Sequence, residues 1–354
     1  MKNAWLAIMI LSFLSLAGQD VRPVRDDVGF CWQRPQMQRL LQLLAATDSK
    51  AYPTRGLVAG ISPHDDFLYA GRQYYPLFKK LRTKEAVIFG VTHAAVRKEI
   101  NDPHGILILD AFRAWTGLSA EAGISPLREW LKEHLGKDDF ITSNQAHSLE
   151  HSIEALVPFL QYYNPGIKIT PIMVTGMPYE KMDELSGRLA GVIAAYIREN
   201  KLQLGKDIVF LISADANHYG RDFNNIPFGE DEQAHRKGTE QDQRIARALV
   251  EGTLDTGKIR KLTQALWGDT YLDYRNTYWC GKYSIPFGLL TISKVTQLVA
   301  GRDLSGKLLR YSDTYSDGVL PLKEAGIGIT APFSLKHWVG FFSAGFSLDA
   351  RQGK

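Results

Sequence analysis

Histidines able to bind a metal follow two apolar runs of the chain. His64 comes directly after the run that closes with Ile61-Ser62-Pro63, and His93 ends the run that starts at Ala86. If these runs are parallel strands of an α/β sheet, their carboxyl ends meet at one edge, which is where ligands bind in such sheets. Two imidazoles there make half of a transition-metal site. The alternative is a pair of histidines that only form hydrogen bonds at strand ends.

An acid and a histidine follow a third apolar run. Asp215 and His218 lie just after the run from Ile208 to Ser213. An Asp-x-x-His pair can ligate a metal, or the carboxylate can orient the imidazole for acid–base catalysis. The alternative is that Asp215 caps the next element and that His218 lies on the surface.

Cys280 is one of only two cysteines in the sequence, the other being Cys31. It precedes a predicted helix that begins near residue 285. A thiolate near a helix N-terminus has a lowered pKa and suits a soft or borderline metal, whereas the ordinary role of a lone cysteine is that of a small buried hydrophobe. A Cys31–Cys280 disulfide would compete with the metal role, and the sequence neither supports nor excludes it.

The stretch from His147 to His151 offers a competing zinc chemistry. It fits the H-x-x-E-H pattern of inverted zinc proteases, in which two histidines one helical turn apart hold zinc and the glutamate, here Glu150, acts as base. The sequence predicts one helix over residues 147–162, as this hypothesis requires. A third ligand would also be needed, and Glu154 is a candidate.

The elements that must position these residues alternate between strands and helices. Such alternation predicts an α/β fold with helices on both faces of a mainly parallel or mixed central sheet. The expected strands cover residues 56–61, 86–93, 105–109, 167–174 and 208–213, with residues 308–315 and 326–331 as a final antiparallel pair. The expected helices cover residues 37–46, 72–81, 126–135, 147–162, 179–197, 231–265 and 285–299. No repeat or linker divides the pattern, so residues 19–354 are expected to form a single domain.

Composition and charge indicate an ordinary globular protein rather than a nucleic-acid-binding one. The 354 residues are 45% hydrophobic and 23% charged, which is ordinary for a globular protein. The net charge of +4 comes from basic residues scattered along the chain, so no nucleic-acid partner is expected.

The N-terminus has the pattern of a signal peptide, predicted over residues 1–18: Lys2, then an apolar stretch from Ala4 to Leu16, then small residues up to Gly18. An exported, periplasmic or secreted protein is therefore expected. An uncleaved N-terminal membrane anchor is the alternative, and no stable membrane span is expected after cleavage.

Six blocks of sequence together resemble the Memo family, also known as AmmeMemoRadiSam system protein B, which is similar in structure to LigB-type class III extradiol dioxygenases. The resemblance runs from about Val21 to Ala331. The blocks are Arg22-Pro23 through Phe30, Pro63-His64 with Tyr69-Ala70-Gly71, Gly90-Val91-Thr92-His93, Glu150-His151-Ser152-Ile153-Glu154 with Pro158-Phe159-Leu160-Gln161, Ser213-Ala214-Asp215 with His218-Tyr219-Gly220, and Cys280-Gly281.

The resemblance implies a three-layer LigB/Memo-like fold and a set of site residues. His64, His93 and Cys280 would bind iron(II) or copper, with zinc as the alternative, and would leave positions open for substrate or oxygen. Asp215 and His218 would face the metal, with His218 in the role of the base. His147 and His151 lie in matched segments without a defined role.

Asp65-Asp66 departs from the pattern, which has Ala-Gly at these positions. Two carboxylates next to His64 add negative charge beside the metal position, which should raise the affinity for a cation and could supply an extra ligand.

The resulting functional expectation is an exported metal-binding protein with redox or oxygen-dependent chemistry on an unidentified small molecule or peptide. Fold similarity does not by itself establish an enzyme activity. The first alternative is a non-catalytic peptide-binding module whose cleft is lined by Tyr271, Tyr274, Tyr278 and Trp279, although aromatic residues in such a run also commonly pack in a core. The second is the zinc hydrolase built on His147, Glu150 and His151.

Overall fold

The computed structural model describes residues 21–48, 56–322 and 326–349. The signal peptide predicted for residues 1–18 lies outside these ranges. Among the described helices, none combines the length and the apolar character that crossing a bilayer requires.

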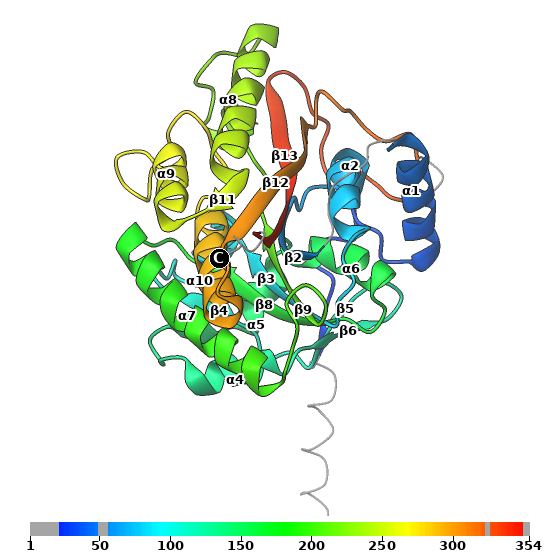
Figure 1. The fold of residues 1–354 in the computed structure, drawn as a ribbon. Coiled ribbons are helices and arrows are strands. Elements are labelled where there is room, and N and C mark those ends of the chain that lie inside the picture. The colour runs from blue at the N-terminus through cyan, green and yellow to red at the C-terminus, as the bar shows by residue number, and fades with distance from the viewer. Residues whose placement is uncertain (1–20, 49–55, 323–325, 350–354) are drawn as a thin grey trace, which may run out of the picture.

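Thirteen strands of the described residues form one mixed sheet, with the main order β1-β5-β6-β8-β3-β9-β2-β13-β12-β11 (Figure 1). Outside this path, β10 pairs with β13, and β4 pairs with β7 and β8. The strands are β1 (Val21–Arg22), β2 (Leu57–Ser62), β3 (Glu85–Gly90), β4 (Leu107–Leu109), β5 (Ala114–Thr116), β6 (Glu121–Ile124), β7 (Phe140–Thr142), β8 (Lys168–Val174), β9 (Ile208–Ser213), β10 (His218–Gly220), β11 (Gly252–Leu254), β12 (Leu304–Asp313) and β13 (His337–Leu348).

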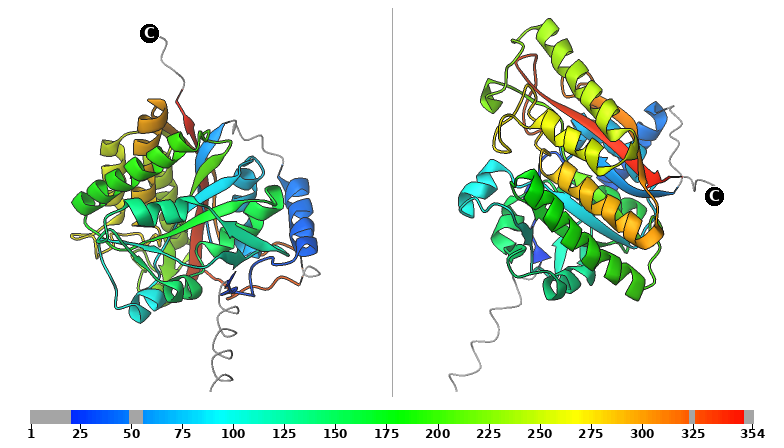
Figure 2. Two further views of the ribbon diagram at one scale, coloured as in Figure 1. Left: turned by 90° about the horizontal axis from the view of Figure 1, so that it is seen from below. Right: turned by 60° about the vertical axis from the view of Figure 1, so that its left-hand side comes forward.

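Helices cover both faces of this sheet. One face carries α4, α7, α9 and α10, and the other carries α1, α2 and α6 (Figures 1 and 2). The three-layer α/β fold predicted from the sequence is therefore confirmed. The helices are α1 (Arg34–Thr47), α2 (Phe67–Phe78), α3 (Ala94–Glu99), α4 (Leu127–His134), α5 (Asn144–Leu149), α6 (Val157–Tyr163), α7 (Tyr179–Glu199), α8 (Glu232–Val250), α9 (Thr256–Leu266) and α10 (Ser284–Ala300), with short 3₁₀ turns at Glu154–Leu156 and Arg221–Phe223.

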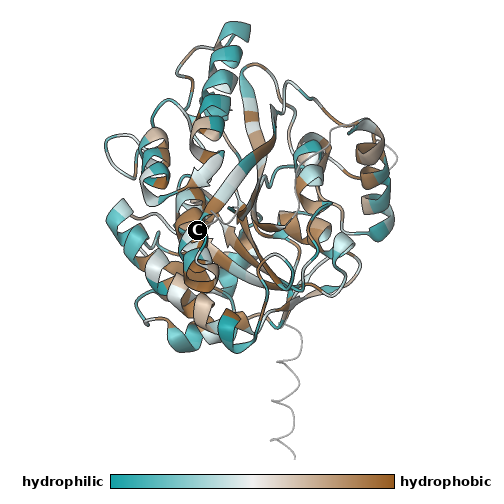
Figure 3. Cartoon of the chain, in the orientation of Figure 1, coloured by the Kyte–Doolittle hydropathy of each residue, from teal (hydrophilic) through white to brown (hydrophobic). Residues whose placement is uncertain are grey.

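Two hydrophobic cores lie on opposite sides of the central strands. Along β3, Val87 and Phe89 pack into the core beneath α7 and α10, whereas Ala86 and Ile88 pack into the core beneath α1, α2 and α6. Successive side chains of a strand point to opposite faces, so a strand covered on both faces is apolar throughout. Figure 3 shows this apolar band along the centre of the sheet.

The central strands β8, β3, β9 and β2 run parallel, which brings their carboxyl ends to one edge of the sheet. The strands that lead to His64 and His93 are not neighbours, however, because β9 lies between β2 and β3. Ser62 is in register with Ser213 of β9, and Ile212 with Phe89 of β3. The residues that follow β9 therefore lie between those that follow β2 and β3.

Two predicted elements, over residues 147–162 and 326–331, differ from the observed ones. The helix predicted over residues 147–162 is broken, because α5 ends at Leu149 and Glu150 adopts an extended backbone. The helical region predicted over residues 231–265 is observed as two helices, α8 and α9, with the short strand β11 between them. Residues 326–331 do not form the last strand, which is instead β13, because that segment is held against the start of α2 by hydrogen bonds from Thr330 to Asp66 and from Tyr69 to the carbonyl of Ala331.

Candidate metal centre

The three ligands expected from the resemblance come together at the carboxyl edge of the sheet. His64 follows β2, His93 follows β3, and Cys280 lies shortly before α10. Each offers a ligand atom, and these atoms all lie within 4.8 Å of one another. His64 and Cys280 are buried, at 2% and 8% exposed.

Hydrogen bonds fix the tautomer of His64. Its Nδ1 lies 2.8 Å from Ser213 Oγ, and Ser213 Oγ donates its own hydrogen to the carbonyl of Ser152 at 2.6 Å. Since the hydroxyl proton is committed to that carbonyl, Nδ1 must carry the hydrogen and Nε2 keeps its lone pair. Burial, and then the neighbouring His93, lower the pKa of His64, so the imidazole is neutral and ready to act as a ligand.

Glu150 fixes the tautomer of His93, as Ser213 does for His64. Its Oε1 lies 2.8 Å from His93 Nδ1, and its Oε2 accepts the backbone N–H of His93 at 3.0 Å. Nε2 of His93 is thereby left as the ligand atom, an arrangement common around metal-binding histidines. Burial opposes protonation of His93, but the Glu150 carboxylate outweighs it and raises the pKa of the imidazole.

Replacing Glu150 with glutamine should weaken metal binding by roughly 10- to 100-fold, the usual effect of losing a carboxylate behind a ligating histidine. The amide removes the negative charge that holds His93 in its orientation. A chelator competition assay would measure the loss. Unchanged affinity would contradict the orienting role, and Glu129→Gln provides a control on the half-exposed surface of α4.

Asp215 lies between the two histidines because it follows β9. Its Oδ1 accepts the backbone N–H of His64 at 3.0 Å, and its Oδ2 lies 3.2 Å from His64 Nε2. Cys280 Sγ lies 3.5 Å from the same Nε2 and accepts the backbone N–H of Asp215 at 3.1 Å. Ligand atoms around one tetrahedral ion lie about 3.3–3.7 Å apart, given bond lengths near 2.0–2.3 Å. The separation of His64 Nε2 and Cys280 Sγ therefore fits two ligands of one transition-metal ion.

The protonation state of Cys280 differs from the expectation drawn from its position near a helix. Burial, followed by the Asp215 carboxylate, raises the pKa of the thiol well above its usual range. Because α10 begins only at Ser284, the helix terminus does not offset the nearby carboxylates. A bound cation would reverse this balance, since metals deprotonate the thiols that coordinate them.

His218 presents one basic nitrogen to the cavity. Its Nδ1 lies 3.2 Å from the carbonyl of Ala216, so Nδ1 carries the hydrogen and Nε2 is bare. Burial lowers the pKa of His218 to about 4, which keeps the imidazole neutral. A second group of possible ligand atoms, which also lie within 4.8 Å of one another, comes from His218, Asp215 and Cys280.

The two histidines of the H-x-x-E-H stretch are separated in the structure. His151 stacks on His93 with ring centroids 4.8 Å apart, and burial lowers its pKa to about 4. His147 is fully buried, pairs through Nε2 with the carbonyl of Ile108 at 3.0 Å and packs against Trp115. The helical zinc-protease arrangement is therefore not formed, because α5 ends before Glu150 and that carboxylate holds His93.

The two aspartates that follow His64 have different surroundings. Asp66 Oδ2 accepts hydrogen bonds from the backbone N–H of Thr330 at 2.6 Å and from its hydroxyl at 3.0 Å, so Asp66 fastens a distant segment. Asp65 lines the cavity, and its Oδ1 accepts the backbone N–H of Asp66. Burial, followed by Asp215 and Asp66, raises the pKa of Asp65 well above its usual range. Its role as an extra ligand stays a prediction.

Cys31 is a free, buried cysteine, as is Cys280, so the conceivable disulfide between them is absent. Desolvation raises the pKa of the Cys31 thiol to about 12. Cys31 packs in the core beneath α1, α2 and α6.

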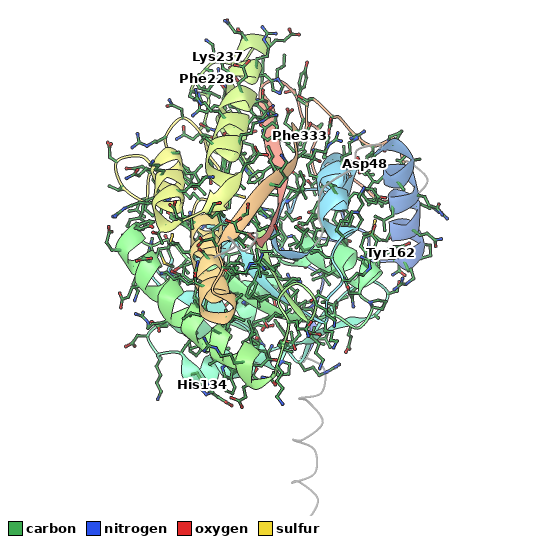
Figure 4. All side chains as sticks on the ribbon, viewed as in Figure 1. Asp48, His134, Tyr162, Phe228, Lys237 and Phe333 are labelled. Carbon is green, nitrogen blue, oxygen red and sulfur yellow. The ribbon has the colours of Figure 1, made fainter. Side chains whose placement is uncertain are left out.

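A cavity of about 410 Å³ opens in front of these groups. Sequence reasoning missed much of its wall, since these residues carry no metal-binding or catalytic pattern. Phe333, labelled in Figure 4, comes from the segment that precedes β13. Of the four aromatic residues predicted to line a peptide cleft, only Tyr278 lines the cavity, whereas Trp279 lies in the core. The missed residues are Arg25, Asp26, Phe30, Ala94, Phe223, Thr330 and Phe333.

The fold and the site together define a three-layer α/β protein with a candidate His/His/Cys metal centre at the carboxyl edge of its sheet. The chain belongs to the Memo-like protein family, whose sequence model matches residues 31–318. The resemblance seen in the sequence is thereby confirmed, and similarity to LigB-type dioxygenases is a general property of this family.

Individual relatives share about a quarter to a third of the aligned residues. A MEMO1 family protein of Pyrococcus horikoshii is 26% identical over 239 residues, which cover 60% of this chain and 72% of the relative. One from Thermococcus kodakarensis is 31% identical over 215 residues, or 56% and 65% of the two chains. One from Saccharolobus solfataricus is 29% identical over 201 residues, or 54% and 63%.

Proposed function

We propose that this protein binds iron(II) or copper through His64, His93 and Cys280 and carries out redox or oxygen-dependent chemistry on a small molecule held in the cavity. The observation that supports the proposal most is the convergence of the three ligand atoms within 4.8 Å. The fixed tautomers of the two histidines add to it, because each leaves Nε2 free for a metal.

The donor set favours a transition metal. Thiolate and imidazole suit copper, iron or zinc, whereas magnesium and calcium prefer oxygen ligands. Bound iron or copper would supply one-electron chemistry and a position for oxygen, and zinc would supply only Lewis acidity. Three protein ligands leave further positions of the ion open to substrate.

The chain's own groups would orient the substrate and move its proton. His218 is placed to accept a substrate proton on Nε2, since its other nitrogen is occupied by the carbonyl of Ala216. Asp215 would hold the backbone of His64 in place, because Oδ1 accepts its N–H. The phenyl rings of Phe30, Phe223 and Phe333 would exclude water from the substrate.

Metal affinity should rise with pH between about pH 6 and pH 8, by roughly tenfold or more per unit. Cys280 and His93 have raised pKa values and Asp215 has a pKa raised by burial to about 7, so all three hold protons in the metal-free protein at the lower end of this window. The metal must displace those protons, and displacement becomes easier as their concentration falls. Competition with a chelator across a pH series would measure the slope, and a flat profile would contradict it.

Protein made without an affinity tag and purified anaerobically would test the proposal. Elemental analysis should find close to one iron or copper per chain. Reduced, metal-loaded protein should consume oxygen when a cell extract that contains the substrate is added. Zinc alone, with no oxygen consumption after iron or copper loading, would favour the hydrolytic alternative. Peptide binding that survives complete metal removal would favour the binding-module alternative.

Export is part of the proposal and is tested separately. Residues 1–18 have the charge, apolar stretch and small residues of a signal peptide. N-terminal sequencing of protein from the native cells should then begin near Gln19, whereas a chain that begins at Met1 or Lys2 would overturn export.

A further inference from the structure

We propose that Asp242, a buried residue of α8, is a positioning residue that holds two stretches of the metal centre in one arrangement. These stretches are the histidine loop, residues 214–218, and the cysteine segment, residues 277–280. Asp242 is 0% exposed and does not belong to the cavity lining. The inference rests on the proposed function for its consequence, since Cys280 would bind the metal and His218 would accept the proton.

The Asp242 carboxylate accepts four hydrogen bonds that come from three separate parts of the chain. Its Oδ1 accepts the indole N–H of Trp279 at 2.7 Å and the hydroxyl of Thr277 at 2.9 Å, both from the cysteine segment. Its Oδ2 accepts the backbone N–H of Asn217, in the histidine loop, at 3.2 Å and the hydroxyl of Tyr311, in β12, at 2.9 Å. One carboxylate therefore joins the histidine loop, the cysteine segment and β12.

The histidine loop and the cysteine segment also bond to each other. The backbone N–H of His218 donates to the carbonyl of Tyr278 at 2.9 Å, and the side chain of Asn217 accepts the backbone N–H of Tyr278 at 3.0 Å. Further along, Cys280 Sγ accepts the backbone N–H of Asp215 at 3.1 Å. A shift of either stretch would therefore move the thiol and the imidazole relative to each other.

Gly340 of β13 makes room for the Asp242 carboxylate. A Cβ at this position would lie only 2.9 Å from Asp242 Oδ2 and 3.0 Å from the hydroxyl oxygen of Tyr311, so a larger residue would push the carboxylate aside. The same glycine bonds the histidine loop to β13, because its carbonyl accepts the N–H of Ala216 and its N–H donates to the carbonyl of Asn217, both at 2.8 Å. Helix α8 packs against β12 and β13, which brings Asp242 to this point (Figure 1).

The surroundings of Asp242 favour positioning over stabilisation of the fold. Within residues 21–48, 56–322 and 326–349, no cation pairs with this carboxylate, and its partners are neutral donors. A neutral, well-packed replacement of a buried ionic group often costs no stability, and in some proteins such groups specify an arrangement instead. Burial raises the pKa of Asp242 to about 6, with the hydrogen bonds opposing the rise, so the test is made at pH 8.

Asp242→Asn and Thr277→Val test the proposal at two strengths. In the first variant the amide nitrogen would face hydrogen-bond donors at whichever oxygen position it took, and the second removes one hydroxyl from the cysteine segment. Titrated with cobalt(II) at pH 8, Asp242→Asn should bind the metal about tenfold or more weakly, as is usual for groups behind metal ligands, and Thr277→Val should show a smaller loss. At saturating cobalt the thiolate-to-cobalt absorption band should also change, which a loss of stability alone would not cause.

Asp110→Asn is the matched control for a structural role. Asp110 is likewise 0% exposed, and it accepts the indole N–H of Trp115 at 2.7 Å. It also pairs with Arg128 and does not line the cavity. This variant should unfold at a lower urea concentration, but it should keep the cobalt affinity and the absorption band of the native protein.

A second measurement needs no metal. Iodoacetamide should alkylate Cys280 about threefold or more faster in metal-free Asp242→Asn than in the native or Asp110→Asn protein, because a loosened segment exposes the thiol. Mass spectrometry would distinguish Cys280 from Cys31. Native protein that binds no cobalt, iron, copper or zinc would refute the proposed function, and the alkylation rates would then decide the positioning role by themselves.

Two results would overturn the inference. One is an unchanged alkylation rate of Cys280 in Asp242→Asn, and the other is an equal loss of cobalt affinity in Asp242→Asn and Asp110→Asn. If Asp242→Asn does not fold, Thr277→Val decides the question, since native cobalt affinity, absorption band and alkylation rate in that variant would overturn the inference as well.

Discussion

Replacing Cys280 with serine is expected to lower the affinity for iron or copper by about 100-fold or more, since a serine hydroxyl is a hard, protonated group that replaces a soft thiolate. His64→Ala should have a similar effect, because it removes Nε2, the atom that lies 3.5 Å from Cys280 Sγ and 3.2 Å from Asp215 Oδ2. Elemental analysis after dialysis, together with chelator competition, would measure both losses.

The chain supplies a matched control for each variant. Cys31→Ser changes the other free cysteine, which packs in the core beneath α1, α2 and α6, and His147→Gln changes a histidine whose Nε2 is occupied by the carbonyl of Ile108. Both should retain full metal content if they fold. Normal loading of Cys280→Ser and His64→Ala would rule out the proposed ligand set, and loss of zinc only in the His147 variant would restore the hydrolase hypothesis.

Replacing Glu154 with alanine should lower the free energy of unfolding by about 3–5 kcal/mol, the usual cost of leaving one charge of a buried ion pair without its partner. Arg22 and Glu154 form an ion pair in which both side chains are 0% exposed. Glu154 also accepts the backbone N–H groups of Arg25 at 3.0 Å and Asp26 at 2.8 Å. Urea unfolding of the metal-free protein would measure the change.

The same substitution should weaken metal binding, because Arg22 ties down the segment that carries Glu150. Its guanidinium donates to the carbonyls of His147 at 2.6 Å and Glu150 at 2.5 Å. Glu121→Ala breaks the exposed pair with Arg113 and serves as the control, since exposed ion pairs add little to stability. A Glu154 variant that unfolds like the Glu121 variant would show that the buried pair does not stabilise the fold.

The fold class could be predicted because the apolar runs are local, whereas the proposed ligand set of His64, His93 and Cys280 was implied by the family resemblance. His64 and His93 end apolar runs, and such runs become strands covered on both faces. The order of the strands is not local, so the position of β9 between β2 and β3 was not predicted. It determines that Asp215 lies between the two histidines.

The remaining wall of the cavity could not be predicted because contacts between distant residues build it. Thr330 lies 264 positions from Asp66, the residue that holds it, and nothing in the spacing of residues 326–331 distinguishes them from a strand. The alternative role of Glu150, as the base of a zinc site, is not formed for a related reason. The H-x-x-E-H pattern has meaning only on a continuous helix, and the chain leaves the helix at that residue.

The hydrogen-bond chain from His64 through Ser213 to the carbonyl of Ser152 has a direction, and that direction limits how protons can travel. Each donor in the chain points away from the cavity, and the chain ends at a carbonyl oxygen, which has no proton to pass on. A proton cannot enter at Nε2 of His64 and leave through Ser213 unless the whole chain reverses. If Nε2 binds the metal as proposed, His64 is closed as a proton wire, and His151 and His218, which also line the cavity, are the imidazoles left to exchange protons with it.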